Sequence, residues 1–200
     1  MTYSIIGFGA VGQALAKAFA RKGIEVAVAG RRPPEAIAQQ AAAIGSTVTP
    51  KALDDALDAD ILLLAVPFSE HRAVAESRRD WHGKTIIDVT NAFGVPVGEL
   101  DGLPSSSVVA SAFAGAKLVK AFNHLAAAKL AADPAVAGGR RVIFLASDDQ
   151  DATASVETLV EQLGFAPVRL GKLAEGGALV QARDRSWAPL IFQDLTKIAG

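Results

Sequence analysis

The 200-residue chain has no cysteine and one tyrosine, and no apolar run reaches the ~20 residues that a membrane-spanning helix needs. The absence of cysteine excludes disulfides, thiolate metal sites and thiol redox chemistry. The N-terminus lacks the basic stretch and apolar run of a signal peptide. A formal net charge of −1 gives no bulk attraction to nucleic acid or to a membrane surface. We therefore expect a soluble, cytoplasmic protein with no nucleic-acid partner and no membrane partner.

Half of the residues are hydrophobic, and short apolar segments alternate with longer, alanine-rich segments of helical character. This alternation predicts crossover connections, a parallel sheet and helices on both faces of the sheet. Strands are expected at residues 3–8, 24–30, 46–50, 61–67, 85–91, 117–123, 140–147 and 165–171. Helices are expected at residues 10–23, 33–45, 51–60, 69–83, 104–116 and 148–164. The tail from residue 172 is less regular, and its apolar stretch WAPLIF (187–192) is expected to be core or a subunit contact.

The first expected strand leads into GFGAVG, where Gly7, Gly9 and Gly12 have G-x-G-x-x-G spacing. Between a strand and a helix, the first glycine permits the tight turn, the second admits a pyrophosphate, and the third lets the helix approach the sheet. The N-terminus of the following helix attracts phosphate through its free N–H groups and its dipole. A turn that serves chain geometry alone is the alternative, and we favour dinucleotide binding. The expected phosphate-binding residues are Gly7, Phe8, Gly9, Ala10, Val11 and Gly12.

These features predict a Rossmann-type, doubly wound α/β fold with a mainly parallel sheet of about eight strands and a small C-terminal extension. Two hundred residues suit one such domain with a small appendage. We expect a dinucleotide-binding domain over residues 1–147 and a small C-terminal portion over 148–200 that completes the sheet and the acceptor site.

The end of the second expected strand carries Gly30, Arg31 and Arg32, where an NAD site places an acidic residue against the ribose 2′-hydroxyl. An acid would repel a 2′-phosphate, whereas arginines bind it through charge-assisted, often bidentate hydrogen bonds. A solvated basic loop is the alternative interpretation. At this position in the fold, we interpret the two arginines as recognising NADP(H).

The sequence offers few groups for acid–base chemistry. Its tyrosine, Tyr3, precedes the first strand, which excludes the Tyr-x-x-x-Lys pair of short-chain dehydrogenases, and too little chain remains for the helical domain of hydroxyacid dehydrogenases. The histidine spacing predicts no metal site. His71 and His82 flank a helix and are expected to be solvated. His124 follows a strand at the carboxyl edge, where ligands bind, and is the candidate catalytic residue, although capping or packing is the favoured role.

A site that holds NADPH without an acid–base pair favours an acceptor that manages its own protons, such as a flavin or deazaflavin ring. Stacking a flat ring on nicotinamide requires small residues and apolar walls. The strand ends offer both, at 65–68, 90–94 and 121–124. Each of these positions also has a purely structural interpretation, which stays open. Pro67 can end a strand, Asn91 and Asn123 can cap or turn the chain, and Phe122 can belong to the core.

Six segments, taken in order, carry a family resemblance. They are GFGAVGQALA (7–16), AGRRP (29–33), AVP (65–67), DVTN (88–91), VKAFN (119–123) and LGFAPVRLGKLAEGGAL (163–179). Together they resemble the coenzyme F420-dependent NADP oxidoreductases and bacterial relatives described as NADPH-dependent reductases, over nearly the whole chain. Similar modules occur in membrane metalloreductases that pass electrons from NADPH through a flavin.

The resemblance implies an NADPH-dependent oxidoreductase, usually a homodimer, that acts on a small-molecule or cofactor substrate such as coenzyme F420, FAD or FMN. It places pyrophosphate at the glycine turn and the 2′-phosphate at the two arginines. The residues expected along the nicotinamide side are Pro67, Asn91 and Asn123, with Ala65 and Val66 beside them. The tail GGALVQARDRSWAPL (176–190) departs from the leucine-rich segment, with an arginine and an acid, of enzymes that reduce the deazaflavin, so the acceptor stays open. A non-catalytic NADP(H) sensor and an NADPH-dependent carbonyl or imine reductase are the alternatives.

Overall fold

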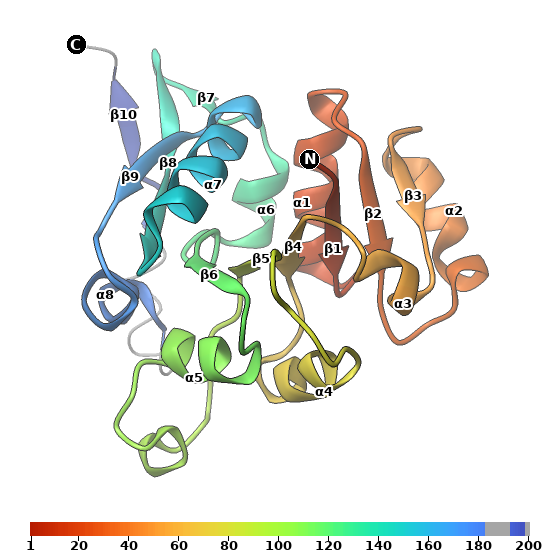
Figure 1. The fold of residues 1–200 in the computed structure, drawn as a ribbon. Helices are drawn as coiled ribbons and strands as arrows, with labels where there is room; N and C mark the ends of the chain where they lie inside the picture. Colours follow the sequence, from red (N-terminus) through yellow and green to blue (C-terminus); the bar gives the residue numbers. More distant parts are fainter. Residues whose placement is uncertain (183–192, 199–200) are drawn as a thin grey trace.

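The computed structural model describes residues 1–182 and 193–198, and in this part of the chain ten strands form one sheet (Figure 1). The spatial order is β10-β8-β6-β5-β4-β1-β2-β3, with β7 and β9 also paired to β8. The strands are β1 Tyr3–Ile6, β2 Val26–Ala29, β3 Val48–Pro50, β4 Ile61–Leu64, β5 Thr85–Asp88, β6 Lys117–Lys120, β7 Ala135–Val136, β8 Gly139–Ser147, β9 Ala166–Arg169 and β10 Thr196–Ile198. Strands β1 to β6 pair in parallel, whereas β8 runs antiparallel to β6, β7 and β10.

Helices cover both faces of this sheet. They are α1 Ala10–Arg21, α2 Pro34–Ile44, α3 Leu53–Ala56, α4 His71–Glu76, α5 Ser105–Ala112, α6 Ala127–Ala131, α7 Gln150–Gln162 and α8 Ala178–Val180, with 3-10 turns at Phe68–Glu70 and Val97–Leu100 and a π-helical turn at Leu173–Gly177. Helices α1, α2, α6 and α7 bury side chains in one core cluster, and α3, α4 and α5 bury theirs in a second. Successive strand residues point to opposite faces, so Ile5 belongs to the first cluster and Ile6 to the second.

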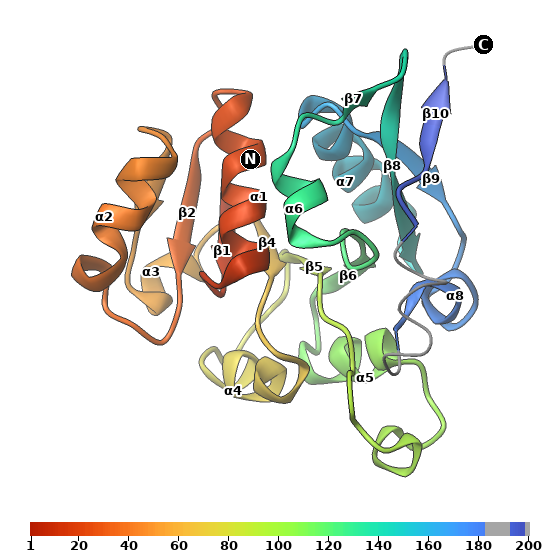
Figure 2. The same ribbon diagram turned by 180° about the vertical axis from the view of Figure 1, so that it is seen from behind.

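Figure 2 shows α1 and α6 side by side, although they lie far apart in the sequence. The Arg21 guanidinium, at the end of α1, donates to the carbonyl of Ala131 at 2.9 Å and so ties the two helices together. None of the helices in the described ranges is both long and apolar enough to cross a bilayer.

The predicted fold class is confirmed, and each expected strand and helix is present over at least part of its range. The elements of the described chain that were not expected are helices α6 and α8, strands β7 and β10, and the short helical turns at Val97–Leu100 and Leu173–Gly177. The apolar stretch at 187–192 lies outside the described residues. Strands β9 and β10, which follow residue 147, both pair with β8. The division of the chain at that residue stays a prediction.

The helix expected at 69–83 is much shorter in the structure, where a 3-10 turn leads into α4 and α4 ends at Glu76. The indole of Trp81 donates to the carbonyl of Ala75 at 3.0 Å, which satisfies an acceptor at the end of the helix as the chain turns back. Trp81 is buried there against Phe113, with ring centroids 4.7 Å apart. Burial of this large ring therefore outweighs continuation of the helix.

The expectation that His71 is solvated is wrong. The side chain is buried, its Nδ1 atom contacts the carbonyl oxygen of Phe68, and its ring packs on Phe68 at 4.6 Å between centroids. The 3-10 turn before α4 folds Phe68 back over the histidine, an arrangement that the helical pattern alone does not reveal. His82 is exposed, as expected.

Candidate dinucleotide-binding site

Most of the predicted site residues lie on the loops that leave the carboxyl ends of five adjacent strands, and Ala10, Val11 and Gly12 form the first turn of α1. In the sheet order β6-β5-β4-β1-β2, these loops carry Asn123, Asn91, Pro67, the glycine turn and Arg31. Four inter-strand spacings of ~4.8 Å make this row about 19 Å long. The chain reverses its direction of winding at β1, which lies between β4 and β2, and open α/β sheets bind ligands at such a point.

The glycine turn depends on two close approaches of the backbone. Gly7 has φ +105°, and a Cβ there would lie 2.4 Å from the carbonyl oxygen of Ala65. A Cβ at Gly12 would lie 1.9 Å from the carbonyl oxygen of Gly7. Both distances are far inside van der Waals contact, so these two glycines let α1 sit directly on the end of β1.

Gly9 is different, because a Cβ added there would meet no atom within 4 Å. It is the N-cap residue of α1, no side chain caps this helix, and its first turn holds no acidic residue. The first N–H groups of a helix have no partner within the helix, so these donors are available to a ligand. The open space and the free donors together fit a pyrophosphate group.

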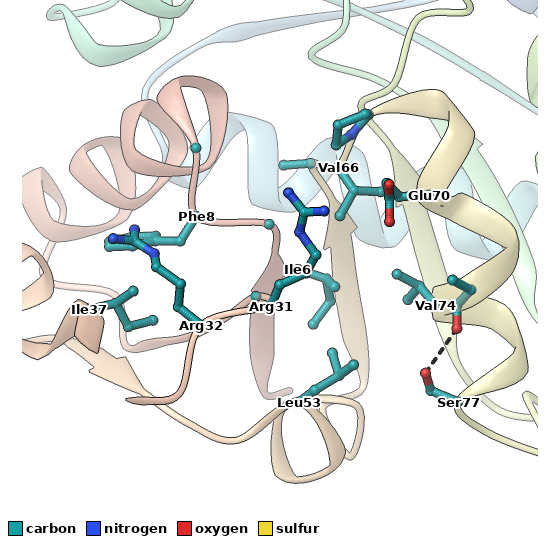
Figure 3. A pocket seen from close by; sticks show the side chains of 16 residues that line it. Ile6, Phe8, Arg31, Arg32, Ile37, Leu53, Val66, Glu70, Val74 and Ser77 are labelled. Atoms are coloured by element: carbon teal, nitrogen blue, oxygen red, sulfur yellow. Dashed lines mark hydrogen bonds between the residues drawn. The ribbon is translucent and has the colours of Figure 1, made fainter. Parts of the chain in front are cut away.

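A pocket of about 580 Å³ opens beside this turn, between the end of β2 and helix α4 (Figure 3). This volume lies within the range of small-molecule and cofactor sites. The predicted residues that line the pocket are Gly7, Phe8, Gly9, Gly30, Arg31, Arg32, Ala65, Val66 and Pro67. The structure adds Ile6, Ile37, Leu53, Glu70, Ala73, Val74 and Ser77. Ala10, Val11, Gly12, Asn91, Asn123 and His124 were predicted but are not part of the lining.

The added residues are mostly apolar and come from several elements that are separate in the sequence. Ile6 ends β1, Leu53 begins α3 and Val74 lies on α4, and together they form an apolar wall suited to the flat face of an adenine ring. In the sequence these positions resemble ordinary core residues of a strand and two helices. Only their meeting in space makes them part of a site, so spacing along the chain gave no indication of them.

The two arginines leave the end of β2 in different directions (Figure 3). Arg31 extends toward the wall formed by Val66 and Glu70, whereas Arg32 extends toward Phe8 and Ile37. The Arg32 guanidinium donates to the side-chain oxygen of Gln40, on α2, at 3.0 Å. Both arginine side chains are exposed, so they can reach an anionic group at the pocket mouth.

Asn91 and Asn123 form a hydrogen-bonded pair at the ends of β5 and β6. The Asn91 amide donates to the backbone carbonyl of Asn123 at 2.8 Å, and the Asn123 amide donates to Oδ1 of Asn91 at 3.0 Å. The pair also holds the C-terminal segment, since Asn123 donates to the Val180 carbonyl at 2.7 Å and Asn91 Oδ1 accepts from the Ala182 N–H at 3.1 Å. The buried Oδ1 of Asn123 has no partner in the described part of the chain.

His124 is fully buried and faces away from solvent. Its Nε2 lies 3.2 Å from the carbonyl of Val142, its ring packs on Phe144 at 4.8 Å, and its Nδ1 has no partner among the described residues. Burial lowers the pKa of the His124 imidazole to about 4, against a smaller opposing effect of the Val142 carbonyl. The neutral ring therefore donates from Nε2 at neutral pH, which matches the packing role that the sequence favoured.

The pocket lining contains three titratable side chains, those of Arg31, Arg32 and Glu70. It holds no histidine, tyrosine or lysine that would form an acid–base pair. In residues 1–182 and 193–198, no group of three or more potential metal ligands comes together. The arrangement can therefore hold a phosphorylated dinucleotide along the carboxyl edge of the sheet.

Known proteins resemble this chain in sequence and in fold. The family model described as NADP oxidoreductase, coenzyme F420-dependent, matches residues 2–92, which include the glycine turn and both arginines. The crystal structure of a hypothetical protein from Sinorhizobium meliloti is 40% identical with a TM-score of 0.89, and the match covers 98% of this chain and 96% of that one. A protein from Arthrobacter sp. FB24, named as a candidate F420-dependent NADP reductase, is 25% identical with a TM-score of 0.75, over 100% of this chain and 99% of that one.

A more distant resemblance links the chain to metalloreductases. Metalloreductase STEAP3 of Rattus norvegicus is 28% identical over 172 residues, which are 85% of this chain and 34% of that protein. The chain thus spans about a third of the length of the curated relatives it matches.

The difference between Gly9 and Gly12 generates a paired prediction. Gly9→Val should abolish NADPH binding in isothermal titration, because its side chain enters the space of the pyrophosphate. The same variant should lower the melting temperature by less than about 4 °C, since the backbone there suits any residue. Gly12→Ala is the matched control and should lower the free energy of unfolding by about 1–3 kcal/mol or more through its clash with Gly7. Retained NADPH affinity in Gly9→Val would place the dinucleotide elsewhere.

Burial of His124 predicts a pH dependence of stability. Its folded-state pKa of about 4 lies below the ordinary value of 6.5, so the unfolded chain takes up the proton first as the pH falls. The free energy of unfolding should therefore decline from pH 6.5 toward 4, with up to about 3 kcal/mol due to His124. Urea unfolding at pH 6.5 and at pH 4 measures this decline, and the part due to His124 should be missing in the His124→Leu variant. The control is Leu130→Ala, which truncates a buried side chain that has no titratable group. Relative to the wild type, it should lower the free energy of unfolding by the same amount at both pH values.

Proposed function

The chain belongs to the coenzyme F420-dependent NADP oxidoreductase family, and from this membership we propose that it transfers hydride between NADP(H) and a flat redox acceptor, such as coenzyme F420 or a flavin. The observation that carries the proposal is a single pocket lined by the glycine turn and by two arginines, with no acid–base pair beside them. Bound NADPH would supply the hydride.

The residues of this chain would bind and orient the dinucleotide from one end of the site to the other. The N–H groups at the start of α1 would hold the pyrophosphate beside Gly9. Arg31 and Arg32 would hold the 2′-phosphate through charge-assisted hydrogen bonds, while the apolar wall formed by Ile6, Leu53 and Val74 would contact the adenine.

The nicotinamide end would lie toward Pro67 and the Asn91–Asn123 pair, which are next in the row of strand ends. Among the described residues, Pro67, Asn91 and Asn123 carry no group that moves a proton, so the proposal assigns proton balance to the acceptor ring or to water. A cytoplasmic homodimer acting on a small-molecule or cofactor substrate belongs to the same proposal.

Cofactor choice provides the first test. A hydrogen bond to a charged group contributes about 1.5–3 kcal/mol, so Arg31→Ala with Arg32→Ala should lower NADPH affinity by roughly ten- to a hundredfold or more. NADH affinity should change by less than about threefold, because NADH has no 2′-phosphate. The matched control is Arg79→Ala with Arg140→Ala, which removes the same charge from two exposed arginines outside the pocket. Wild-type protein that binds NADH as tightly as NADPH would contradict the assignment.

The second test concerns the acceptor and the proton. NADPH oxidation should be measured with coenzyme F420, with FMN and FAD, and with a panel of carbonyls and imines. We expect turnover with a flat-ring acceptor, and a loss smaller than about a hundredfold for His124→Leu and for Asn123→Ala, because removal of a general acid or base costs 10²–10⁴-fold.

Two outcomes would contradict the flat-ring mechanism. Tight NADPH binding without turnover on any acceptor would favour a sensor of the NADPH/NADP ratio. A loss of about a thousandfold in His124→Leu, together with loss of a pH limb near neutrality, would identify His124 as an acid in carbonyl or imine reduction.

A further inference from the structure

A fully buried ion pair lies directly behind the Asn91–Asn123 pair. Lys120 Nζ is 2.9 Å from Asp88 Oδ2, and neither side chain has any exposed surface. Removing two charges from water is unfavourable for each ion, and a pair of apolar residues of similar volume is often as stable at such a place. Stability alone therefore gives little reason for this pair at the ends of β5 and β6.

The hydrogen bonds of the Asp88–Lys120 ion pair indicate another role. Asp88 Oδ1 accepts from the backbone N–H of Thr90 at 2.9 Å and from its hydroxyl at 2.7 Å. Lys120 Nζ donates to the backbone carbonyl of Thr90. The ion pair thus holds the N–H, the hydroxyl and the carbonyl of one residue, the residue that precedes Asn91.

The segment that follows β6 is also held in place at this end of the sheet. The N–H of Ala121 donates to the backbone carbonyl of Asp88 at 3.2 Å. Phe122 follows with φ +61°, a left-handed conformation that is unfavourable for a residue with a side chain and persists only where the surroundings enforce it. Phe122 is fully buried, with its ring edge-on to Phe165 at 6.3 Å, and the turn directs the chain into Asn123.

We propose that Asp88 and Lys120 are positioning residues, which fix Thr90 and thereby place Asn91 and Asn123 against the nicotinamide end of NADP(H). This inference rests on the function proposed above. An apolar pair would fill the same volume but could not hold the three polar groups of Thr90. Neither Asp88 nor Lys120 lines the pocket that receives the adenosine end, so their effect should be confined to the nicotinamide end.

The experiment compares two probes that share the adenosine 2′-phosphate but differ in the nicotinamide. NADPH and 2′,5′-ADP are titrated calorimetrically into the wild type and into Lys120→Met, and the fluorescence of the bound reduced nicotinamide is recorded at saturation. Lys120→Met should lower NADPH affinity by about tenfold and 2′,5′-ADP affinity by less than about twofold. The fluorescence change that NADPH shows on binding the wild type should also shrink, because the ring is no longer held.

Thr90→Val is the milder variant, since it removes only the hydroxyl that donates to Asp88. It should show the same selective pattern with about a threefold loss of NADPH affinity. The matched control is Val156→Ala, a buried truncation on α7, which should lower the melting temperature without separating the two probes. The control shows what loss of stability alone does to binding.

The outcomes separate this inference from the function on which it rests. If the wild type binds neither NADPH nor 2′,5′-ADP, the proposed function is overturned and the inference with it. If the wild type binds both, and both variants weaken the two probes equally or leave NADPH affinity and fluorescence unchanged, only the positioning role is overturned.

Discussion

The close approach of α1 to β1 is the constraint on which the site depends. A side chain at Gly12 would overlap the carbonyl of Gly7, and one at Gly7 would overlap the carbonyl of Ala65. With both glycines present, the start of α1 sits at the edge of the sheet, and its unpaired N–H groups open into the space beside Gly9. The pocket, the arginines at the end of β2 and the row of loops beyond β4 are all placed relative to this contact.

The carboxyl edge of the sheet changes in character along its length. Exposed arginines lie at the β2 end, where charge can meet a phosphate in water, and an apolar wall follows between β1 and α4. At the β6 end, the amides of Asn91 and Asn123 are paired with each other and backed by a buried ion pair. An exposed, positively charged end suits the phosphates of a nicotinamide dinucleotide, and a hydrogen-bonded, uncharged pair of amides suits its ring.

Much of the fold could be predicted from the sequence because its elements follow local periodicity. The alternation of apolar runs and helical segments, with glycines at one turn, was sufficient for the order of the elements and for the parallel centre of the sheet. The sequence pattern did not predict the local structure correctly where tertiary contacts determine it. Trp81 folds back on α4 and ends it early, Phe68 covers His71, and β10 exists through its pairing with β8.

The sequence by itself determined the Rossmann-type architecture, the glycine turn and the positive charge after the second strand, since each depends on residues that are close together in the chain. Only the tertiary structure decided which residues line the pocket, because Leu53 and Val74 reach it from separate helices. It also decided that His124 is buried and that Lys120 meets Asp88, since neighbouring strands bring these residues together across 32 positions of sequence. Burial and pairing of polar groups are properties of the packed sheet, and no local pattern contains them.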